Sequence, residues 1–316
     1  MTIQDSTTIA FDKQAWEFFA HKELRDQLLW DEFAHVTPQS RSSKGSVIKF
    51  TFVADFDPAT TALDEVTDVE PVATTDTNVT LTVAEYGNAY KTSKWIRANS
   101  FIPLDPILAE KLGRNAGESL DILARNAYHS GTTIVFGGDA TDEDEVVPGD
   151  ELTAALVRRQ HATLKTANVQ PFSGGKYAFV VHPHVSVDLR EETGADKWRD
   201  PMTYGQDQSR IWNGEIGTFE GFRFVESNRA VIEAAAGAGT TPADVYNNIA
   251  MGREAVAKGF DGEIGPKPVI VSSPVVDSLN RFKGMGWYWI GGYVVFREEC
   301  LINVKVGSSL DTGYVA

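Results

Sequence analysis

The sequence predicts an α+β protein in which one long amphipathic helix accompanies several strands. Residues 104–131 repeat apolar side chains at spacings of three and four, which is typical of a helix with one buried face. Residues 44–53 and 78–98 alternate in strand fashion. After residue 150, helical and strand patterns alternate, which indicates a mixed lobe. The 316 residues suit one large domain or two interleaved lobes, since single cores stop growing near roughly 250 to 300 residues.

Residues 1–40 are expected to form an amphipathic arm. Apolar side chains recur there at helical spacing before Pro38, namely Trp16, Phe19, Leu24, Leu28 and Trp30. The segment lacks the basic start and the apolar run of a signal peptide. No stretch approaches the roughly 18 apolar residues of a membrane helix, so we expect no membrane contact.

The segment between the two alternating runs is strongly acidic. From residue 55 to residue 85 the chain carries eight acids and no Lys or Arg: Asp55, Asp57, Asp64, Glu65, Asp68, Glu70, Asp76 and Glu85. It is too polar and too rich in Pro and Thr for a core of its own, so it should project as a long hairpin tip. The segment is either a solvated loop or an interaction segment, and structureless loops above roughly 20 residues are commonly functional.

The helical stripe in residues 104–131 consists of Leu108, Leu112, Ala116, Leu120, Leu123 and Ala127. Asp105 is expected to cap the helix, Pro106 suits its first turn, and Gly131 suits its end. A helix of about 25 residues would be roughly 37 Å long at 1.5 Å per residue. Such a helix has the dimensions of a spine.

Composition limits the function. The chain has 44 acids against 29 Lys and Arg, a formal charge of −15, which disfavours sequence-specific DNA binding because phosphate affinity comes from clustered basic residues. An acidic wall around packaged DNA is reasonable, since it would not adhere to the polymer. Cys300 is the single cysteine, and its setting indicates a buried strand position rather than a nucleophile.

Motifs for catalysis or metal binding are weak. His182, His184 and Asp188 could suggest a metal site, but without a third His or a ligand signature ordinary turn histidines are favoured. The acids Asp139, Asp142, Glu143, Asp144 and Glu145 do not have the spacing of a calcium loop. Motifs for nucleotide binding and for a nucleophile elbow are absent from the sequence. We therefore expect no catalytic residue, metal or cofactor.

Two further patterns indicate turns and packing. Gly214, Gly217 and Gly221 are expected to supply turns around a strand. The aromatic run Trp287, Tyr288, Trp289 and Tyr293 could be a platform for sugars or bases, but its alternation favours packing in a core or a subunit interface.

The order of these parts resembles the coat proteins of tailed phages, which share the Hong Kong 97 type fold, and more narrowly their N-four-like branch. The segments that carry the resemblance are LTVAEYGNAYKTSKW, ILAEKLGRNAGESLDILARNAY, FVVHPHVSVDLR, GTFEGFRFVESNRA and GMGWYWIGGYVVFREECLINVKV. The resemblance implies an N-terminal arm (1–43), an E-loop (44–98) and a peripheral domain with the spine helix (99–148). It further implies a mainly axial domain (149–290), with a peripheral excursion near 221–229, and a return to the peripheral domain (291–316).

What the resemblance implies for function is a major capsid protein. Such a subunit assembles with copies of itself into hexamers and pentamers that enclose double-stranded DNA in a virion, and it is assembled in the host cytoplasm. Portal, scaffold and decoration proteins are expected partners. An encapsulin-like nanocompartment shell and an acid-pair hydrolase are the alternatives.

The resemblance also places the E-loop over a neighbouring subunit near its spine. We expect the acids Asp64, Glu65, Asp68 and Glu70 to meet basic side chains there. The candidate partners are Lys91, Lys94, Arg97, Lys111, Arg114 and Arg125.

Overall fold

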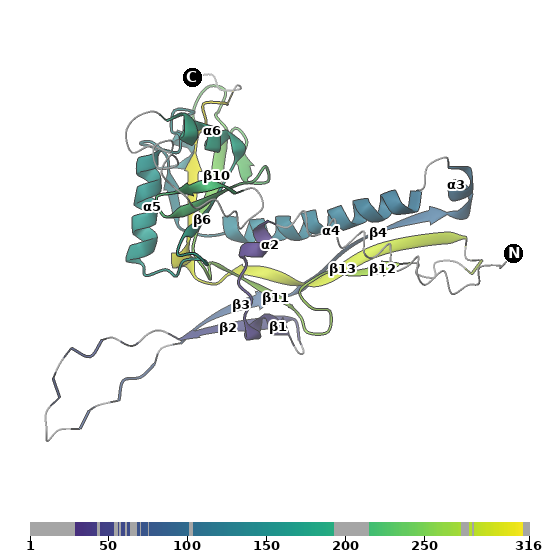
Figure 1. The fold of residues 1–316 in the computed structure, drawn as a ribbon, viewed down its shortest axis with the longest axis horizontal. Helices are drawn as coiled ribbons and strands as arrows, with labels where there is room; N and C mark the ends of the chain where they lie inside the picture. Colours follow the sequence, from purple (N-terminus) through teal and green to yellow (C-terminus); the bar gives the residue numbers. More distant parts are fainter. Residues whose placement is uncertain are drawn as a thin grey trace.

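The computed structural model describes residues 29–42, 45–53, 56, 58–60, 62–63, 68–69, 71–74, 76–100, 104–192, 215–272, 278–279 and 281–311. In this part of the chain, a compact lobe, a long helix and a projecting hairpin form an elongated molecule (Figure 1). The predicted α+β class is confirmed. The arm residues Trp16, Phe19, Leu24 and Leu28 lie outside the described residues, as do Asp64, Glu65, Glu70 and Gly214.

The long helix α4 (Leu104–His129) confirms the predicted spine, with 26 residues. Its apolar stripe faces strand β13, where Leu112 and Leu120 are buried together with Trp287 and Trp289. The aromatic run therefore packs in the core, as its alternation predicted. Because Leu120 and Trp289 are almost fully buried, this contact holds the helix along the sheet.

The start of α4 differs from the prediction. The helix begins at Leu104, so Asp105 lies in the first turn and is not the residue that caps it. The carboxylate of Asp105 instead accepts a hydrogen bond from Lys283 Nζ at 3.3 Å and pairs with Arg97 at 3.7 Å. An acid in the first turn is also favoured by the helix dipole.

A five-stranded sheet runs along one face of α4 (Figure 1). Its strand order is β1-β11-β13-β12, and β4 also pairs with β13, over ten residue pairs. The strands are β1 (Arg41–Ser42), β4 (Ala84–Ser93), β11 (Val256–Asp261), β12 (Val269–Ser272) and β13 (Phe282–Val295). The helix α3 (Lys94–Asn99) follows β4 directly.

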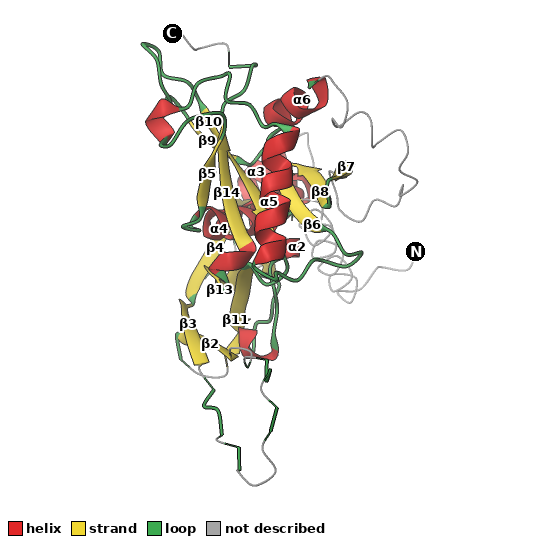
Figure 2. Ribbon diagram, turned by 90° about the vertical axis from the view of Figure 1, so that its left-hand side faces the viewer, coloured by secondary structure: helices red, strands yellow, loops and turns green. Residues whose placement is uncertain are grey.

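The compact lobe contains a seven-stranded sheet in the order β5-β14-β10-β6-β8-β7, with β9 paired to β10. Its strands are β5 (Ile134–Phe136), β6 (Tyr177–Val181), β7 (Glu215–Phe219), β8 (Phe222–Glu226), β9 (Val231–Glu233), β10 (Val245–Met251) and β14 (Leu301–Val306). Figure 2 shows the helices α5 (Ala154–Thr166) and α6 (Pro183–Glu191) beside this sheet. The core is aromatic, with Phe179 and Phe224 stacked 5.0 Å apart, and Val157 of α5 packs into it.

A two-stranded hairpin forms the base of the projecting loop. Strands β2 (Val47–Val53) and β3 (Asp76–Thr82) pair along their whole length, and Phe50 and Leu81 anchor them against Ala257. The predicted run 78–98 is therefore divided, because its second half leaves the hairpin as β4 and α3. The reason is packing, since Tyr86 and Tyr90 of β4 lie against the core under α4.

Four short helical segments complete the described chain. They are α2 (Trp30–Phe33), η1 (Pro38–Ser40), η2 (Glu143–Glu145) and η3 (Glu298–Cys300). Cys300 is buried as predicted, although it ends η3 and precedes the strand. Burial raises the pKa of its thiol to about 11.

The predicted domain boundaries do not follow the sheets. Strands β11, β12 and most of β13 lie within 149–290 but belong to the five-stranded sheet, whereas β14 lies within 291–316 but belongs to the seven-stranded sheet. Strand β8, in the predicted excursion 221–229, lies between β6 and β7 in the lobe. Sequence order alone does not show this exchange of strands between the two sheets. Strand β14 pairs with β10, which lies some fifty residues earlier in the chain.

One predicted turn is also different. Gly221, with a φ of +84°, joins β7 to β8 as expected, together with Glu220 at +47°. Gly217 instead lies inside β7, where the register with β8 shifts. An irregular strand position is a common place for glycine, because a residue without a side chain adopts unusual backbone angles at little cost.

Candidate assembly surfaces

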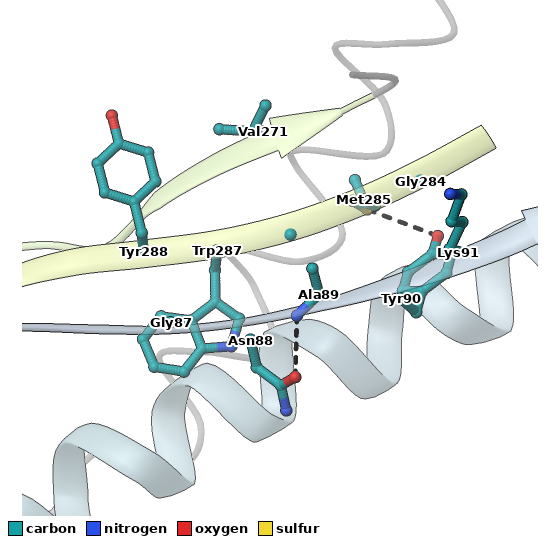
Figure 3. Close-up of a pocket in the computed structure, with 11 residues that line it drawn as sticks. Gly87, Asn88, Ala89, Tyr90, Lys91, Val271, Gly284, Met285, Trp287 and Tyr288 are labelled. Carbon is teal, nitrogen blue, oxygen red and sulfur yellow. Dashed lines mark hydrogen bonds between the residues drawn. The ribbon is translucent and has the colours of Figure 1, made fainter. Parts of the chain in front are cut away.

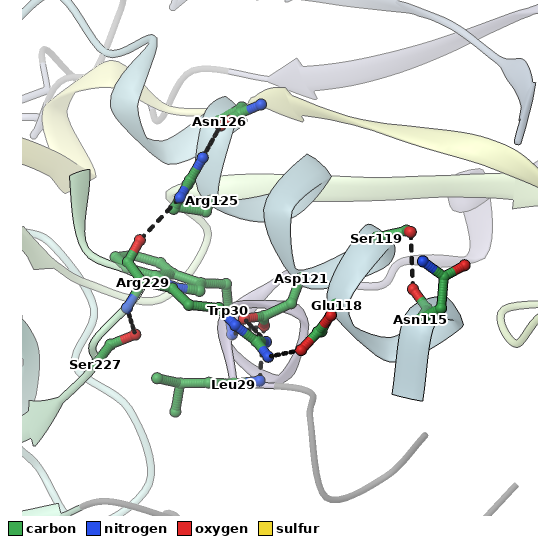
Figure 4. A network of polar contacts seen from close by, with 10 residues as sticks. All are labelled: Leu29, Trp30, Asn115, Glu118, Ser119, Asp121, Arg125, Asn126, Ser227 and Arg229. Atoms are coloured by element: carbon green, nitrogen blue, oxygen red, sulfur yellow. Dashed lines mark hydrogen bonds and ion pairs between the residues drawn. The ribbon is translucent and has the colours of Figure 1, made fainter. Parts of the chain in front are cut away.

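Residues 29 and 30, which lie within the predicted N-terminal arm (1–43), are anchored on α4 by the buried carboxylate of Asp121 (Figure 4). Its Oδ1 accepts the backbone N–H groups of Leu29 and Trp30, at 2.8 Å and 2.7 Å. No side chain of its own caps α2, so Asp121 satisfies donors at the start of that helix. Burial raises the pKa of Asp121, although these hydrogen bonds lower it in part.

The same carboxylate also ties the compact lobe to α4. Arg229 donates to Asp121 Oδ2 at 3.1 Å and to Glu118 at 3.1 Å, and its carbonyl accepts from Arg125 at 3.0 Å. Figure 4 shows that these groups converge beside Trp30. Near residue 229, the turn after β8 and the Arg229 side chain therefore extend from the lobe, and this side chain reaches α4.

A second, partly buried contact holds the same segment on the five-stranded sheet. Asp31 Oδ1 accepts hydrogen bonds from Lys258 Nζ and from the Tyr293 hydroxyl, each at 2.6 Å. Trp30 is fully buried and lies 5.6 Å from the ring of Tyr128. Trp30 and Phe33 are thus part of the subunit core, and any arm before them starts from a fixed point.

The acidic loop between β2 and β3 exposes apolar side chains. Phe56, Leu63, Val69 and Val72 are 58–77% exposed. Of the four predicted contact acids, Asp68 is described, and its exposed carboxylate accepts from the adjacent Val69 N–H at 2.9 Å. The described residues of this loop contain no helix or strand.

The predicted basic set is divided along α4. Lys91 lies 4.6 Å over the Phe282 ring, Arg97 pairs with Asp105, and Arg114 pairs with Glu110 at 3.6 Å. Lys94 and Lys111 are exposed and form no ion pair with other described residues.

Arg125 differs from the other five basic residues. Its guanidinium is held by the Arg229 carbonyl and by Asn126, near the compact lobe. It lies 11 residues after Arg114 on α4, which is about 16 Å along the helix axis. The structure therefore places Arg125 beside the compact lobe, apart from Arg114.

Trp95 was not among the residues predicted from the sequence. This side chain on α3 is 80% exposed, and its neighbour Ile96 is 53% exposed. The signal that could have identified it is an aromatic residue between Lys94 and Arg97, directly after a strand. Large exposed apolar side chains of this kind are typical of interfaces.

An open groove of about 590 Å³ lies on the face of the five-stranded sheet that points away from α4 (Figure 3). Val271 and Tyr288 form its walls, while Gly87 and Gly286 lie in its floor. A Cβ at Gly87 would lie 2.7 Å from a main-chain oxygen, and one at Gly286 would lie 2.9 Å from the nearest Cβ. The close pairing of β4 and β13 therefore requires a residue without a side chain at both floor positions.

The residues considered for metal binding have structural partners. His182 caps α6, and His184 Nδ1 lies 2.9 Å from the Tyr246 hydroxyl. Glu143 of the acidic connector accepts a hydrogen bond from Lys305 Nζ at 2.6 Å. No group of three His, Cys, Asp or Glu is arranged for a metal within the described ranges, and none of the helices described there could span a membrane.

The sequence matches the family model for phage capsid proteins over residues 151–309, just over half of the chain. Among solved structures, the chain is similar to the capsid of Ralstonia phage GP4, with a TM-score of 0.73, 14% identity, and coverage of 89% of this chain and 88% of that one. It is also similar to the capsid of cyanophage Pam1, with a TM-score of 0.66, 15% identity, and 89% and 90% coverage. For Mycobacterium phage Che8 the TM-score is 0.56, with 18% identity and 88% and 90% coverage.

A search of curated proteins finds no match. The likeness to the solved structures, all below 25% identity, shows a common fold, and the N-four-like branch stays a prediction. The family match favours a phage capsid over a nanocompartment shell or an acid-pair hydrolase. With its fold of the Hong Kong 97 type and the family model covering more than half of its length, the chain belongs to the phage capsid protein family as a structural major capsid protein.

Proposed function

We propose that the chain assembles with copies of itself into hexamers and pentamers, which close an icosahedral shell around double-stranded DNA. The observation that carries this proposal is the projecting hairpin. Its loop exposes four large apolar side chains, and a two-stranded ribbon is marginal without further contacts. Neighbouring copies can supply those contacts, and one repeated interface then builds a closed assembly.

In this proposal the sheets divide the subunit into its parts. The N-terminal arm, predicted as residues 1–43, comprises the residues before 29, and the hairpin from β2 to β3 is the E-loop. The five-stranded sheet with α4 is the peripheral domain, and the lobe around the seven-stranded sheet is the axial domain. The role is structural and requires no catalytic residue or cofactor.

The DNA is enclosed without sequence-specific recognition. The formal charge of −15 opposes tight adhesion to phosphates, so the packaged polymer can move against the wall. Portal, scaffold and decoration proteins are the further partners, and assembly takes place in the host cytoplasm.

An ionic contact between copies is part of the proposal. The acids Asp64, Glu65, Asp68 and Glu70 of one copy meet Lys91, Lys94, Arg97, Lys111 and Arg114 of the next. Exposed pairs contribute about 0–1 kcal/mol each, so single changes should have little effect while the sum over a shell is measurable. Arg125 is left out, because its guanidinium is already engaged near Arg229.

Changing all four acids to Asn or Gln should weaken shells at low salt and leave the melting of the unassembled subunit nearly unaltered. Added salt should narrow the difference from wild type through screening. A matched control removes four exposed acids elsewhere, with Asp139→Asn, Asp144→Asn, Glu191→Gln and Glu263→Gln. Shells of the loop variant that are as stable as wild type at low salt would show that the loop is merely solvated.

Assembly itself is tested by negative-stain microscopy and light scattering of the expressed protein, alone and with its scaffold and portal partners. The expected result is capsomers or particles tens of nanometres wide. A strictly monomeric protein at high concentration, with those partners present, would contradict the proposal. Nucleic acid in particles from infected cells would separate a genome shell from a shell with protein cargo.

A further inference from the structure

One surface of the compact lobe is basic, although the protein as a whole is acidic. Residues 152–187 contain four Lys and Arg and no Asp or Glu, whereas the whole chain has a formal charge of −15. The structure places these bases on helix α5 and on the segment that follows it, residues 167–176. We term this region the α5 surface.

Helix α5 presents bases on the side turned away from the seven-stranded sheet (Figure 2). Leu156, Val157 and Leu164 are buried in the core of the lobe, so the opposite side of the helix is in contact with solvent. Arg159 and Lys165 are exposed on that side. They form no ion pair with other described residues, so their charges are available to a partner.

Small side chains fill the space between these two bases. Ala155, Ala162 and Thr166 are exposed, and their helical spacing places them between Arg159 and Lys165 on the surface of α5. A rod-shaped partner can therefore approach the helix closely, while the long basic side chains reach it from both sides.

Two further bases extend the surface beyond the end of α5. Arg253 is exposed, and its backbone N–H donates to the Gln170 carbonyl at 2.9 Å. Lys176 closes a turn in which its carbonyl accepts the Phe172 N–H at 3.0 Å. These hydrogen bonds fix the backbone positions of both bases beside the helix.

The acids beside this surface already have partners within the subunit. Glu220 accepts a hydrogen bond from Arg158 at 2.9 Å. Glu254, which follows Arg253 in the chain, pairs with Arg297 at 3.7 Å. The exposed bases of the α5 surface therefore contribute positive charge that these acids do not neutralise, and a partner should carry negative charge.

The kind of partner is indicated by the lack of an apolar anchor. None of the large apolar side chains described between residues 135 and 231 is exposed. Protein interfaces depend on a few large anchors that become buried, whereas contacts to nucleic-acid phosphates are made by Arg, Lys and small polar side chains. The α5 surface has the chemistry of a phosphate contact.

We infer that the α5 surface contacts the phosphate backbone of the packaged double-stranded DNA. The inference rests on the proposed enclosure of DNA and names the part of the subunit that touches it. Contacts of this kind carry no sequence information and weaken with salt, because each neutralised phosphate releases counterions. The acidic remainder of the subunit keeps the contact weak, so the polymer lies along the wall without adhering tightly.

The first test is the binding of a fluorescent DNA duplex to the unassembled subunit, followed by anisotropy at several salt concentrations. The triple variant Arg159→Gln, Lys165→Gln and Arg253→Gln should bind at least about tenfold more weakly at low salt. Its slope of log K against log salt should be smaller by about 2.7, from about 0.9 for each lost phosphate contact. Because all three side chains are exposed, the melting of the subunit should not change.

A matched control removes three exposed bases elsewhere, with Lys49→Gln, Lys267→Gln and Arg281→Gln. This variant has the same net charge as the first, but it should keep the wild-type slope and most of the affinity. An equal loss in both variants would show that total charge alone matters, and would overturn the inference. A wild-type subunit that binds no duplex at low salt would also overturn it.

A second measurement uses filled particles, in which formaldehyde joins lysine side chains to DNA. After digestion, the DNA-linked peptides should include Lys165 or Lys176, and links from other segments alone would contradict the inference. The triple variant should still form shells. Loss of shells with unchanged duplex binding would make the surface a contact between copies, which also overturns the inference. Wild-type particles without DNA would count against the proposed function instead.

Discussion

Replacing Asp121 with alanine should destabilise the unassembled subunit by about 3 kcal/mol or more. The change leaves the backbone N–H groups of Leu29 and Trp30 without their acceptor, and buried donors in this state cost about 1–3 kcal/mol each. Removing one partner of a buried ion pair costs about 3–5 kcal/mol. Arg229 keeps its contact with Glu118, and burial raises the pKa of Asp121, so the lost ion pair should add little. The two lost acceptor contacts alone then give about 2–6 kcal/mol, which sets the expected loss of about 3 kcal/mol or more.

The assay is urea unfolding of the unassembled subunit, followed by circular dichroism and by tryptophan fluorescence. In Asp121→Asn one side-chain oxygen remains to accept both N–H groups, but the charge is lost. The decrease in the free energy of unfolding should therefore be about half that of Asp121→Ala. Glu118→Ala is the matched control, because its side chain is 44% exposed and has one described contact, and it should lose about 1 kcal/mol or less. If Asp121→Ala loses no more than Glu118→Ala, the carboxylate does not root the segment as argued.

Three further changes have defined outcomes. Leu120→Asp should prevent folding, because an unpaired buried charge costs several kcal/mol, whereas Ile122→Asp on the exposed side of α4 should remain soluble with little change in melting. The pKa of His129 is lowered to about 4, mainly by burial and then by Arg125. The neutral imidazole therefore stabilises the fold above pH 6.5, and this contribution is lost as the pH falls from 6.5 to about 4. In His129→Gln the free energy of unfolding should therefore decrease less between pH 6.5 and about 4, by up to roughly 3 kcal/mol. An unchanged pH dependence would refute this. The Cys300 thiol should resist an aromatic disulfide reagent in the native subunit and react fully in urea, and rapid native labelling would show that the site is open.

The sequence was most informative where a local pattern and the tertiary environment agree. The stripe containing Leu112 and Leu120 has helical periodicity, and the same side chains face the sheet, so both the helix and its buried side were predictable. The hairpin base was predictable for the same reason, since Phe50 alternates with exposed neighbours.

The exchange of strands between sheets was not predictable in this way. Strand β14 is buried at every position, so its apolar run fits a place in either sheet, and pairing with β10 decides between them. The candidate assembly surfaces were also only partly predictable from the sequence. The acids of the loop are obvious in the sequence, whereas Trp95 is an ordinary aromatic residue until the structure shows that no described element covers it.

The fixed root of the arm has a consequence for biosynthesis. Asp31 precedes its partners Lys258 and Tyr293 by 227 and 262 residues in the chain. At roughly 5–20 residues per second, Asp31 waits about 13–50 seconds before Tyr293 has even been synthesised. During that interval the apolar side chains of Trp30 and Phe33 lack the pocket that buries them. In the nascent chain the fixing of Asp31 therefore depends on strands β11 and β13, which are synthesised much later, and deletion of β13 should release residues 29–33 as well.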